Sequence, residues 1–157
     1  MPHTLVVIRH AKSDWEVAAT DRDRPLAARG RRQAPVTGAW LAAEGVRPDL
    51  AIVSPAERAR ATWALVAAEL QGAVPTRIEE AAYTFDGDDL LDLVRATPED
   101  IATLALVGHN PAVEELLESL TGEWVRMPTS ALAVVELPSW TASLGSGRVA
   151  YAGRPAD

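Results

Sequence analysis

The 157-residue sequence contains no cysteine, and this absence excludes a disulfide framework, a thiolate metal site and a cysteine nucleophile. No apolar run approaches the ~20 residues that a membrane-spanning helix needs. The opening residues, Met1-Pro2-His3-Thr4, lack the charged and apolar regions of a signal peptide. We therefore expect a cytoplasmic protein that does not associate with membranes.

Lysine is almost absent, because the 15 basic residues are 14 arginines and Lys12. A coding bias towards arginine is enough to explain the excess, although a guanidinium group also matches the geometry of phosphate oxygens. The basic residues face 22 acidic ones, which gives a net charge of −7. A chain of this charge repels nucleic acid unless its positive charge is concentrated locally.

Composition and length predict one globular domain over residues 1–157. Apolar residues make up 48% of the chain and charged residues 24%, and a domain of this size can bury a sizeable core. Apolar runs alternate with helical patterns, which favours an α/β three-layer sandwich with a mostly parallel sheet covered by helices on both faces. We predict strands at 5–8, 50–53, 76–80, 103–107, 131–137 and 148–151, the last at an edge. The predicted helices are 26–45, 55–70, 90–96 and 112–120.

Two local features qualify this assignment. Pro35 lies inside the first helical segment and is expected to kink or restart the helix. Residues 85–89 read as a loop. In the first helix we expect Val36, Trp40 and Ala43 to share one face, and in the second Trp63 and its i+3 and i+7 neighbours to be buried.

Unusual polar residues follow three of the predicted strands. Arg9 and His10 end the first strand, Arg58 lies just beyond the second, and His109 follows the fourth. Ligands of parallel α/β sheets bind beyond the carboxyl ends of the strands, so these side chains are expected to meet there.

Each of these junctions also has a purely structural explanation. Ser54 could cap the second helix, with Pro55 at its first position and Glu57 completing a capping box. Asn110 could likewise cap the helix that Pro111 starts. Arg58 and His109 are not explained in this way: a cation in the first turn opposes the helix dipole by ~0.3–1 kcal/mol, and a histidine is not needed at such a junction.

Two arginines, two histidines and adjoining helix N-termini favour a dianion, for which phosphate is the obvious candidate. Metal binding is the competing use of histidine. The chain has only His3, His10 and His109, without an HxH or HExxH pattern, so we expect no metal and no other cofactor.

The motifs together resemble those of the histidine phosphatase superfamily, most closely its small SixA-type branch of phosphohistidine phosphatases. The resemblance is carried by the segments Leu5-Val6-Val7-Ile8-Arg9-His10-Ala11-Lys12-Ser13, Arg24-Pro25-Leu26, Arg29-Gly30, Ser54-Pro55…Arg58-Ala59…Thr62-Trp63 and Val107-Gly108-His109-Asn110-Pro111. It implies a phosphoglycerate-mutase-like fold and a phosphorylated histidine intermediate.

By this resemblance His10 is the nucleophile, and Arg9, Arg58 and His109 bind the phosphate with it. Larger relatives also carry a glutamate proton donor, for which Glu80 is the nearest candidate, with Glu79 and Tyr83 close by. The usual Arg-His-Gly of the family is Arg9-His10-Ala11 here.

We therefore expect a cofactor-independent phosphatase that acts on phosphohistidine of a protein through a covalent intermediate on His10. His10 must be neutral to attack phosphorus, and neighbouring arginines should lower its pKa, while a backbone carbonyl fixes the tautomer. A weak proton donor favours P–N or aryl phosphate cleavage over sugar phosphates. The alternatives are a non-catalytic phospho-ligand binding or regulatory domain and a phosphatase of small-molecule phosphate esters. A mutase is least favoured, since little chain is left to enclose an intermediate.

The loop 13–24 is expected beside the pocket. The arginines of residues 22–32 could form a basic rim that recognises a partner, although a solvated loop and helix face is the preferred interpretation. Trp15 and Trp40 are expected to serve packing. No pattern in the sequence specifies an oligomeric state.

Overall fold

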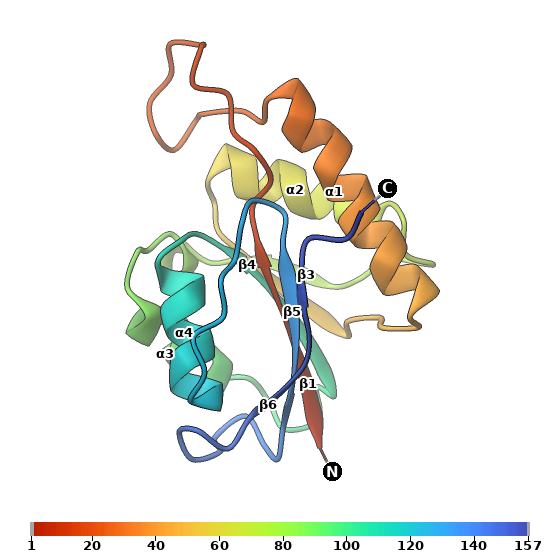
Figure 1. Ribbon diagram of the computed structural model, residues 1–157, viewed down its shortest axis with the longest axis vertical. Helices are drawn as coiled ribbons and strands as arrows, with labels where there is room; N and C mark the ends of the chain where they lie inside the picture. Colours follow the sequence, from red (N-terminus) through yellow and green to blue (C-terminus); the bar gives the residue numbers. More distant parts are fainter. Residues whose placement is uncertain (1, 157) are drawn as a thin grey trace.

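The computed structural model describes residues 2–156 and shows a six-stranded sheet between two pairs of helices (Figure 1). The strand order is β3-β2-β4-β1-β5-β6, in which β1 to β4 are parallel and β5 and β6 are antiparallel to their neighbours. The strands are β1 (His3–Arg9), β2 (Leu50–Val53), β3 (Thr76–Ile78), β4 (Thr103–Gly108), β5 (Leu132–Leu137) and β6 (Arg148–Gly153). The predicted α/β sandwich is confirmed, and β6 is at the edge, as predicted.

The helices are α1 (Ala28–Ala43), α2 (Glu57–Ala67), α3 (Gly87–Arg95) and α4 (Ala112–Thr121), with a short 3-10 turn, η1, at Glu80–Ala82. Helices α1 and α2 cover one face of the sheet, and α3 and α4 cover the other (Figure 1). No helix within residues 2–156 is long and apolar enough to cross a membrane.

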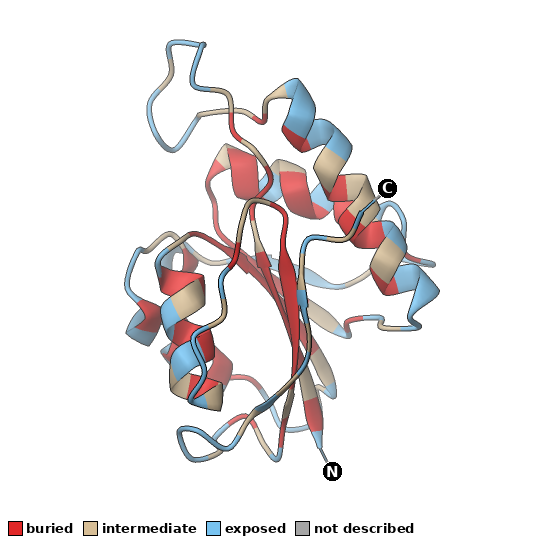
Figure 2. Ribbon diagram, viewed as in Figure 1, coloured by how far each residue is buried: buried red, intermediate tan, exposed pale blue. Residues whose placement is uncertain are grey.

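The central strands separate two hydrophobic cores. In β1, Leu5 and Val7 pack towards α3 and α4, whereas Val6 and Ile8 pack towards α1 and α2. All four side chains are fully buried, as Figure 2 shows for the centre of the sheet. Continuous apolar runs are typical of parallel strands that are covered on both faces.

Two predictions about the helices are wrong. The first is that Pro35 restarts α1, which runs through it as one helix whose buried side includes Ala34 and Leu41. Val36, Trp40 and Ala43 do share one face of this helix, but Val36 and Trp40 are half-buried and Ala43 is exposed. Helix α1 approaches α2 through Gly38, where a Cβ atom would lie 2.4 Å from the carbonyl oxygen of Val66. Small residues allow this contact, and hydrophobic periodicity does not reveal it.

Helix α3 starts within the segment 85–89 that was expected to be a loop. Asp86 caps the helix by accepting a hydrogen bond from the N–H of Asp88. Gly87 packs so closely on α4 that a Cβ atom would lie 2.5 Å from the Cβ of Glu115, whose carboxylate accepts the Gly87 N–H. The tertiary contact, together with the cap, extends the helix by one turn.

Candidate active site

The strand order brings the two sequence-predicted histidines together. β1 and β4 are neighbours in register, with Arg9 opposite Gly108, and the N–H of His10 donates to the carbonyl of Gly108 at 3.1 Å. His10 and His109 therefore leave adjacent strands at the same edge. Their ring centroids lie 5.2 Å apart at an angle of 53°.

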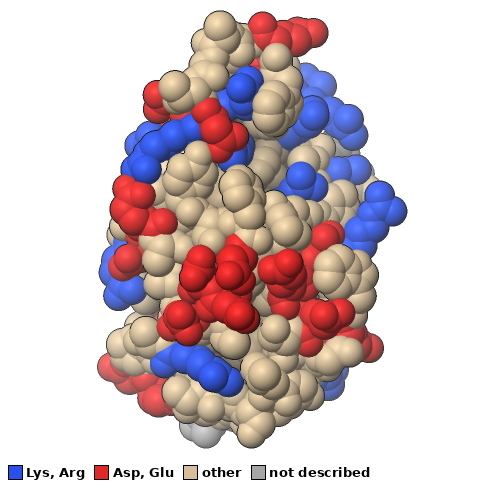
Figure 3. All heavy atoms as spheres, turned by 90° about the vertical axis from the view of Figure 1, so that its left-hand side faces the viewer, with Lys and Arg blue, Asp and Glu red and all other residues tan. Residues whose placement is uncertain are grey.

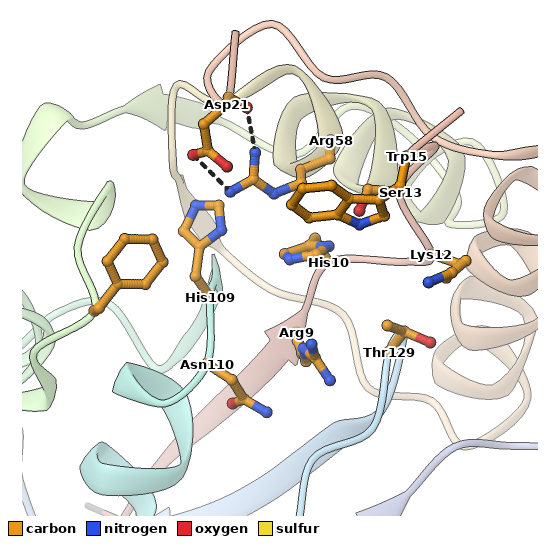
Figure 4. A pocket seen from close by; sticks show the side chains of 11 residues that line it. Arg9, His10, Lys12, Ser13, Trp15, Asp21, Arg58, His109, Asn110 and Thr129 are labelled. Atoms are coloured by element: carbon orange, nitrogen blue, oxygen red, sulfur yellow. Dashed lines mark hydrogen bonds and ion pairs between the residues drawn. The ribbon is translucent and has the colours of Figure 1, made fainter. Parts of the chain in front are cut away.

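Arg9 and Arg58 complete this group from two other directions. Arg58 is the second residue of α2, is buried, and reaches the pocket from the side of β2. Arg9 donates through Nη1 to the carbonyl of Met127, which also accepts a hydrogen bond from Asn110 at 2.8 Å. All four predicted phosphate-pocket residues line one cavity of about 270 Å³ (Figure 4).

The backbone around Ala11 holds the His10 imidazole in place. His10 Nδ1 lies 2.8 Å from the carbonyl oxygen of Ala11 and donates to it, so the proton is on Nδ1 and Nε2 has a free lone pair. The Ala11 N–H donates in turn to Thr62 Oγ1 at 2.9 Å, and Thr62 belongs to α2. The predicted backbone acceptor is thus the carbonyl of Ala11, tied to α2 by Thr62.

Both imidazoles are neutral at physiological pH. Burial, aided by the positive charges of Arg58 and Arg9, lowers the pKa of His10 from 6.5 to about 4. Burial and the charges of His10 and Arg58 lower the pKa of His109 to about 3. Desolvation by burial is thus a larger cause of the low pKa of His10 than the arginine charges that the sequence predicts.

Ser54 is the hydrogen-bond partner of His109 and does not cap α2, which begins at Glu57 without a side-chain cap. Its Oγ lies 2.7 Å from His109 Nε2 and accepts the N–H of Ala56 at 3.2 Å. The hydroxyl keeps its own proton and can donate it to Nε2; in that tautomer the ring proton of His109 is on Nδ1. Within residues 2–156 the buried Nδ1 has no hydrogen-bond partner.

Asn110 does not cap α4 either. Helix α4 begins at Ala112, after the cis peptide bond between Asn110 and Pro111, and the Asn110 amide turns to Met127. Glu114 accepts the N–H of Met127 at 2.7 Å. The backbone N–H and carbonyl of Met127 are thus both hydrogen-bonded to polar side chains, and the carbonyl also orients Arg9.

Asp21 is a pocket residue that the sequence analysis missed. Its backbone carbonyl accepts from Arg58 Nη1 at 2.6 Å, and its carboxylate accepts from Arg58 Nη2 at 3.2 Å (Figure 4). The carboxylate also accepts from the hydroxyl of Tyr83. The hydrogen bond from Tyr83, with the charge of Arg58, lowers the pKa of Asp21, so this carboxyl is ionised at neutral pH. No local pattern marks Asp21, since Arg58 lies 37 positions away.

Glu80, the candidate proton donor, is not among the residues that line this cavity. It lies fully exposed in η1 and forms an ion pair with Arg22. The positive charge of Arg22 and its hydrogen bonds lower the pKa of Glu80. The structure therefore places Glu80 at the rim as a charged partner of the loop and not beside His10.

The loop 13–24 lies beside the pocket, as expected, and contributes Ser13, Trp15 and Asp21 to its lining. Arg24 donates to the carbonyls of three loop residues, Asp14, Val17 and Ala19, and stacks on Trp15. The expectation that Trp15 serves packing is wrong, since its side chain is largely exposed, whereas Trp40 packs on Tyr151.

The predicted basic rim is only partly free. Arg22 and Arg24 are engaged as described, and Arg31 donates to the carbonyl of Leu26 at 2.8 Å. Figure 3 shows that acidic side chains gather on the face that carries α3 and α4, to which Asp88, Asp89, Glu114 and Glu115 belong. Across the described part of the chain, no three histidine or acidic residues are grouped to hold a metal ion.

A parallel α/β sheet whose carboxyl edge presents two neutral imidazoles and two guanidinium groups defines a phosphate-handling protein. The family model of the histidine phosphatase superfamily (branch 1) matches residues 5–90, more than half of the chain. A SixA protein of Agrobacterium tumefaciens has the same fold at a TM-score of 0.86, with 29% identity and 99% of each chain covered.

Two further relatives agree. An uncharacterized protein of Mycobacterium tuberculosis is 32% identical over 157 residues, which cover 93% of this chain and 97% of that protein. The structure of the protein histidine phosphatase SixA complexed with tungstate matches at a TM-score of 0.83, with 26% identity and 97% of each chain covered. The chain therefore belongs to the histidine phosphatase superfamily, with its phosphoglycerate-mutase-like fold, and it is a phosphatase.

Proposed function

We propose that this phosphatase hydrolyses phosphohistidine on a protein through a covalent phosphohistidine on His10, without a cofactor. The proposal rests on the tautomer and the protonation state of the His10 imidazole. Its Nδ1 proton is fixed on the carbonyl of Ala11 and its pKa is about 4, so Nε2 is an unprotonated nucleophile at the pocket.

The remaining residues suit the transfer of a phosphoryl group. In the first step the Nε2 lone pair of His10 forms a bond to phosphorus while the bond to the leaving nitrogen breaks. We infer that Arg9, Arg58 and His109, which all line the cavity, bind the equatorial oxygens, over which the transition-state charge spreads. Water then attacks phosphorus, the P–N bond to His10 breaks, and inorganic phosphate leaves.

The acid chemistry of the pocket supports a nitrogen leaving group. An alcohol with a pKa of ~16 needs a proton as its bond to phosphorus breaks. The one carboxyl in the pocket lining, among the described residues, is Asp21, and it is ionised; Glu80 lies outside. An imidazole whose other ring nitrogen is protonated leaves as a neutral molecule and needs no such donor.

The relatives support the same substrate class. The protein histidine phosphatase SixA, which shares the fold at 26% identity, was solved with tungstate, a tetrahedral oxyanion of the kind that this pocket fits. The cavity of about 270 Å³ is also just below the ~300–1,000 Å³ of typical small-molecule sites. It has room for a phosphoryl group and a small ring.

The test compares turnover of a phosphohistidine protein, an aryl phosphate and a sugar phosphate in excess EDTA. We expect the first two to be hydrolysed, His10→Ala to abolish both reactions, and chelation to have no effect. Phosphate binding without turnover would instead support the non-catalytic binding domain. A sugar phosphate hydrolysed far faster than the phosphohistidine protein would identify an enzyme for small-molecule esters.

A further inference from the structure

Two aromatic side chains at the pocket are left unexplained by phosphoryl transfer. Trp15, in the loop 13–24, and Phe85, just before α3, both line the cavity that holds His10 and His109. They are 66% and 56% exposed, although large apolar side chains are normally buried. What sets these two rings apart from the other exposed apolar side chains is that both line the cavity of His10 and His109.

The Trp15 ring is held rigidly. The guanidinium of Arg24 lies 4.0 Å from the indole centroid and is itself fixed by hydrogen bonds to the carbonyls of Asp14, Val17 and Ala19. Arg24 covers one side of the indole, and most of the rest is open to solvent. Figure 4 shows Trp15 lying across the pocket from His109, on the side of His10.

The Phe85 ring is also positioned. Its centroid lies 6.1 Å from that of His109 in an edge-on arrangement with an interplanar angle of 67°. The following turn is anchored by the Asp86 cap and by the hydrogen bond of Gly87 to Glu115 at 2.8 Å. Phe85 thus presents a preformed apolar surface beside the histidine that binds the phosphate.

We propose that Trp15 and Phe85 form a subsite for a planar leaving group, and that its occupant is the imidazole ring of the substrate phosphohistidine. The inference rests on the proposed function and adds the residues that select the ring. Aromatic faces stack on planar rings and attract those that carry positive charge, as a protonated phosphoimidazole does. An alkyl or amino leaving group offers no such surface.

An imidazole leaving group also needs no proton donor from the pocket. When phosphorus transfers to His10 Nε2, the P–N bond of the substrate breaks and its electron pair stays on the leaving ring nitrogen. The ring already carries a proton on its other nitrogen, so it departs as neutral imidazole and no protein group has to donate a proton. Trp15 and Phe85 offer this ring aromatic surfaces within the same cavity as the attacking nitrogen.

The experiment uses two substrates with the same phosphoryl group and the same kind of bond. Phosphoimidazole has a ring on the nitrogen and phosphoramidate does not. The quantity measured is the ratio of kcat/KM for phosphoimidazole to kcat/KM for phosphoramidate. We expect Trp15→Ala and Phe85→Ala each to lower this ratio by about three- to tenfold, the range of one aromatic contact.

Trp124→Ala is the matched control, because Trp124 is 58% exposed but lies outside the cavity lining. It should leave the ratio unchanged, and Trp15→Phe should largely retain it. If neither Trp15→Ala nor Phe85→Ala changes the ratio of the two kcat/KM values, the subsite is overturned. This holds even if the rates with phosphoimidazole and phosphoramidate fall together. That result leaves the proposed function intact, whereas failure of the wild-type protein to hydrolyse phosphohistidine at all removes the function itself.

Discussion

The low pKa values of the pocket histidines predict that acid weakens the fold through the active site. In the unfolded chain an imidazole takes up a proton near pH 6.5, whereas His10 in the folded protein does so only near pH 4. Between these values the unfolded state binds more protons, so the free energy of unfolding falls as the pH falls. The contribution is complete above about pH 6.5 and is lost by about pH 4.

The magnitude follows from the pKa itself. Lowering it from 6.5 to about 4 corresponds to about 3 kcal/mol for His10. His109 acts in the same direction, with a pKa of about 3. Because the charge of His10 contributes to the lowered pKa of His109, the two contributions do not add in full.

Urea denaturation of the wild type and of His10→Asn between pH 7.5 and pH 4 measures the effect. Asparagine is neutral throughout this range, so the variant retains the acid sensitivity of the carboxylates and loses that of His10, together with the part of the His109 shift that the charge of His10 causes. The wild type should lose about 3 kcal/mol more than the variant across this range. Parallel curves for the two proteins would refute a desolvated, neutral His10.

Three other substitutions test separate parts of the site. Ser54→Ala removes the hydrogen bond to His109 Nε2 and should lower kcat/KM by about tenfold. The ring nitrogen chemical shifts of His109, which report its tautomer, should also change; unchanged shifts would contradict the role of the serine. Asp21→Asn removes the carboxylate that competes for Arg58 and should tighten inhibition by inorganic phosphate about fivefold, on the order of 1 kcal/mol for this half-exposed pair; weaker inhibition would show that Asp21 chiefly orients Arg58. Gly30→Ala places a Cβ atom 2.2 Å from the carbonyl oxygen of Lys12 and should destabilise the protein by about 2–3 kcal/mol in thermal melts; an unchanged Tm would mean that α1 moves away freely.

Much of the architecture was predictable because its signals are local. The central strands are uninterrupted apolar runs, and the polar residues that follow them mark the carboxyl edge of the sheet. The expected meeting of His10 and His109 depended only on those runs being parallel strands of one sheet. The fold, and the proximity of these two residues, could therefore be inferred without coordinates.

Other features depended on contacts between distant segments. The segment from Ser54 to Glu57 fits a capping box by type and spacing, yet the hydroxyl of Ser54 serves His109, 55 positions away. Asp21 and Trp15 lie in a loop without periodicity, and only their contacts to Arg58 and Arg24 reveal them. Local patterns do not contain this information.

The insertion of β4 between β1 and β2 has a consequence for synthesis of the chain. His10 and Arg58 leave the ribosome early. The strand that joins their halves of the sheet, β4, begins 36 positions after the end of α2 and is followed directly by His109. Until it emerges, β1 and β2 have unpaired edges and no common platform. A nascent fragment thus holds His10 and both pocket arginines without His109, and the pocket is completed only when β4 closes the sheet.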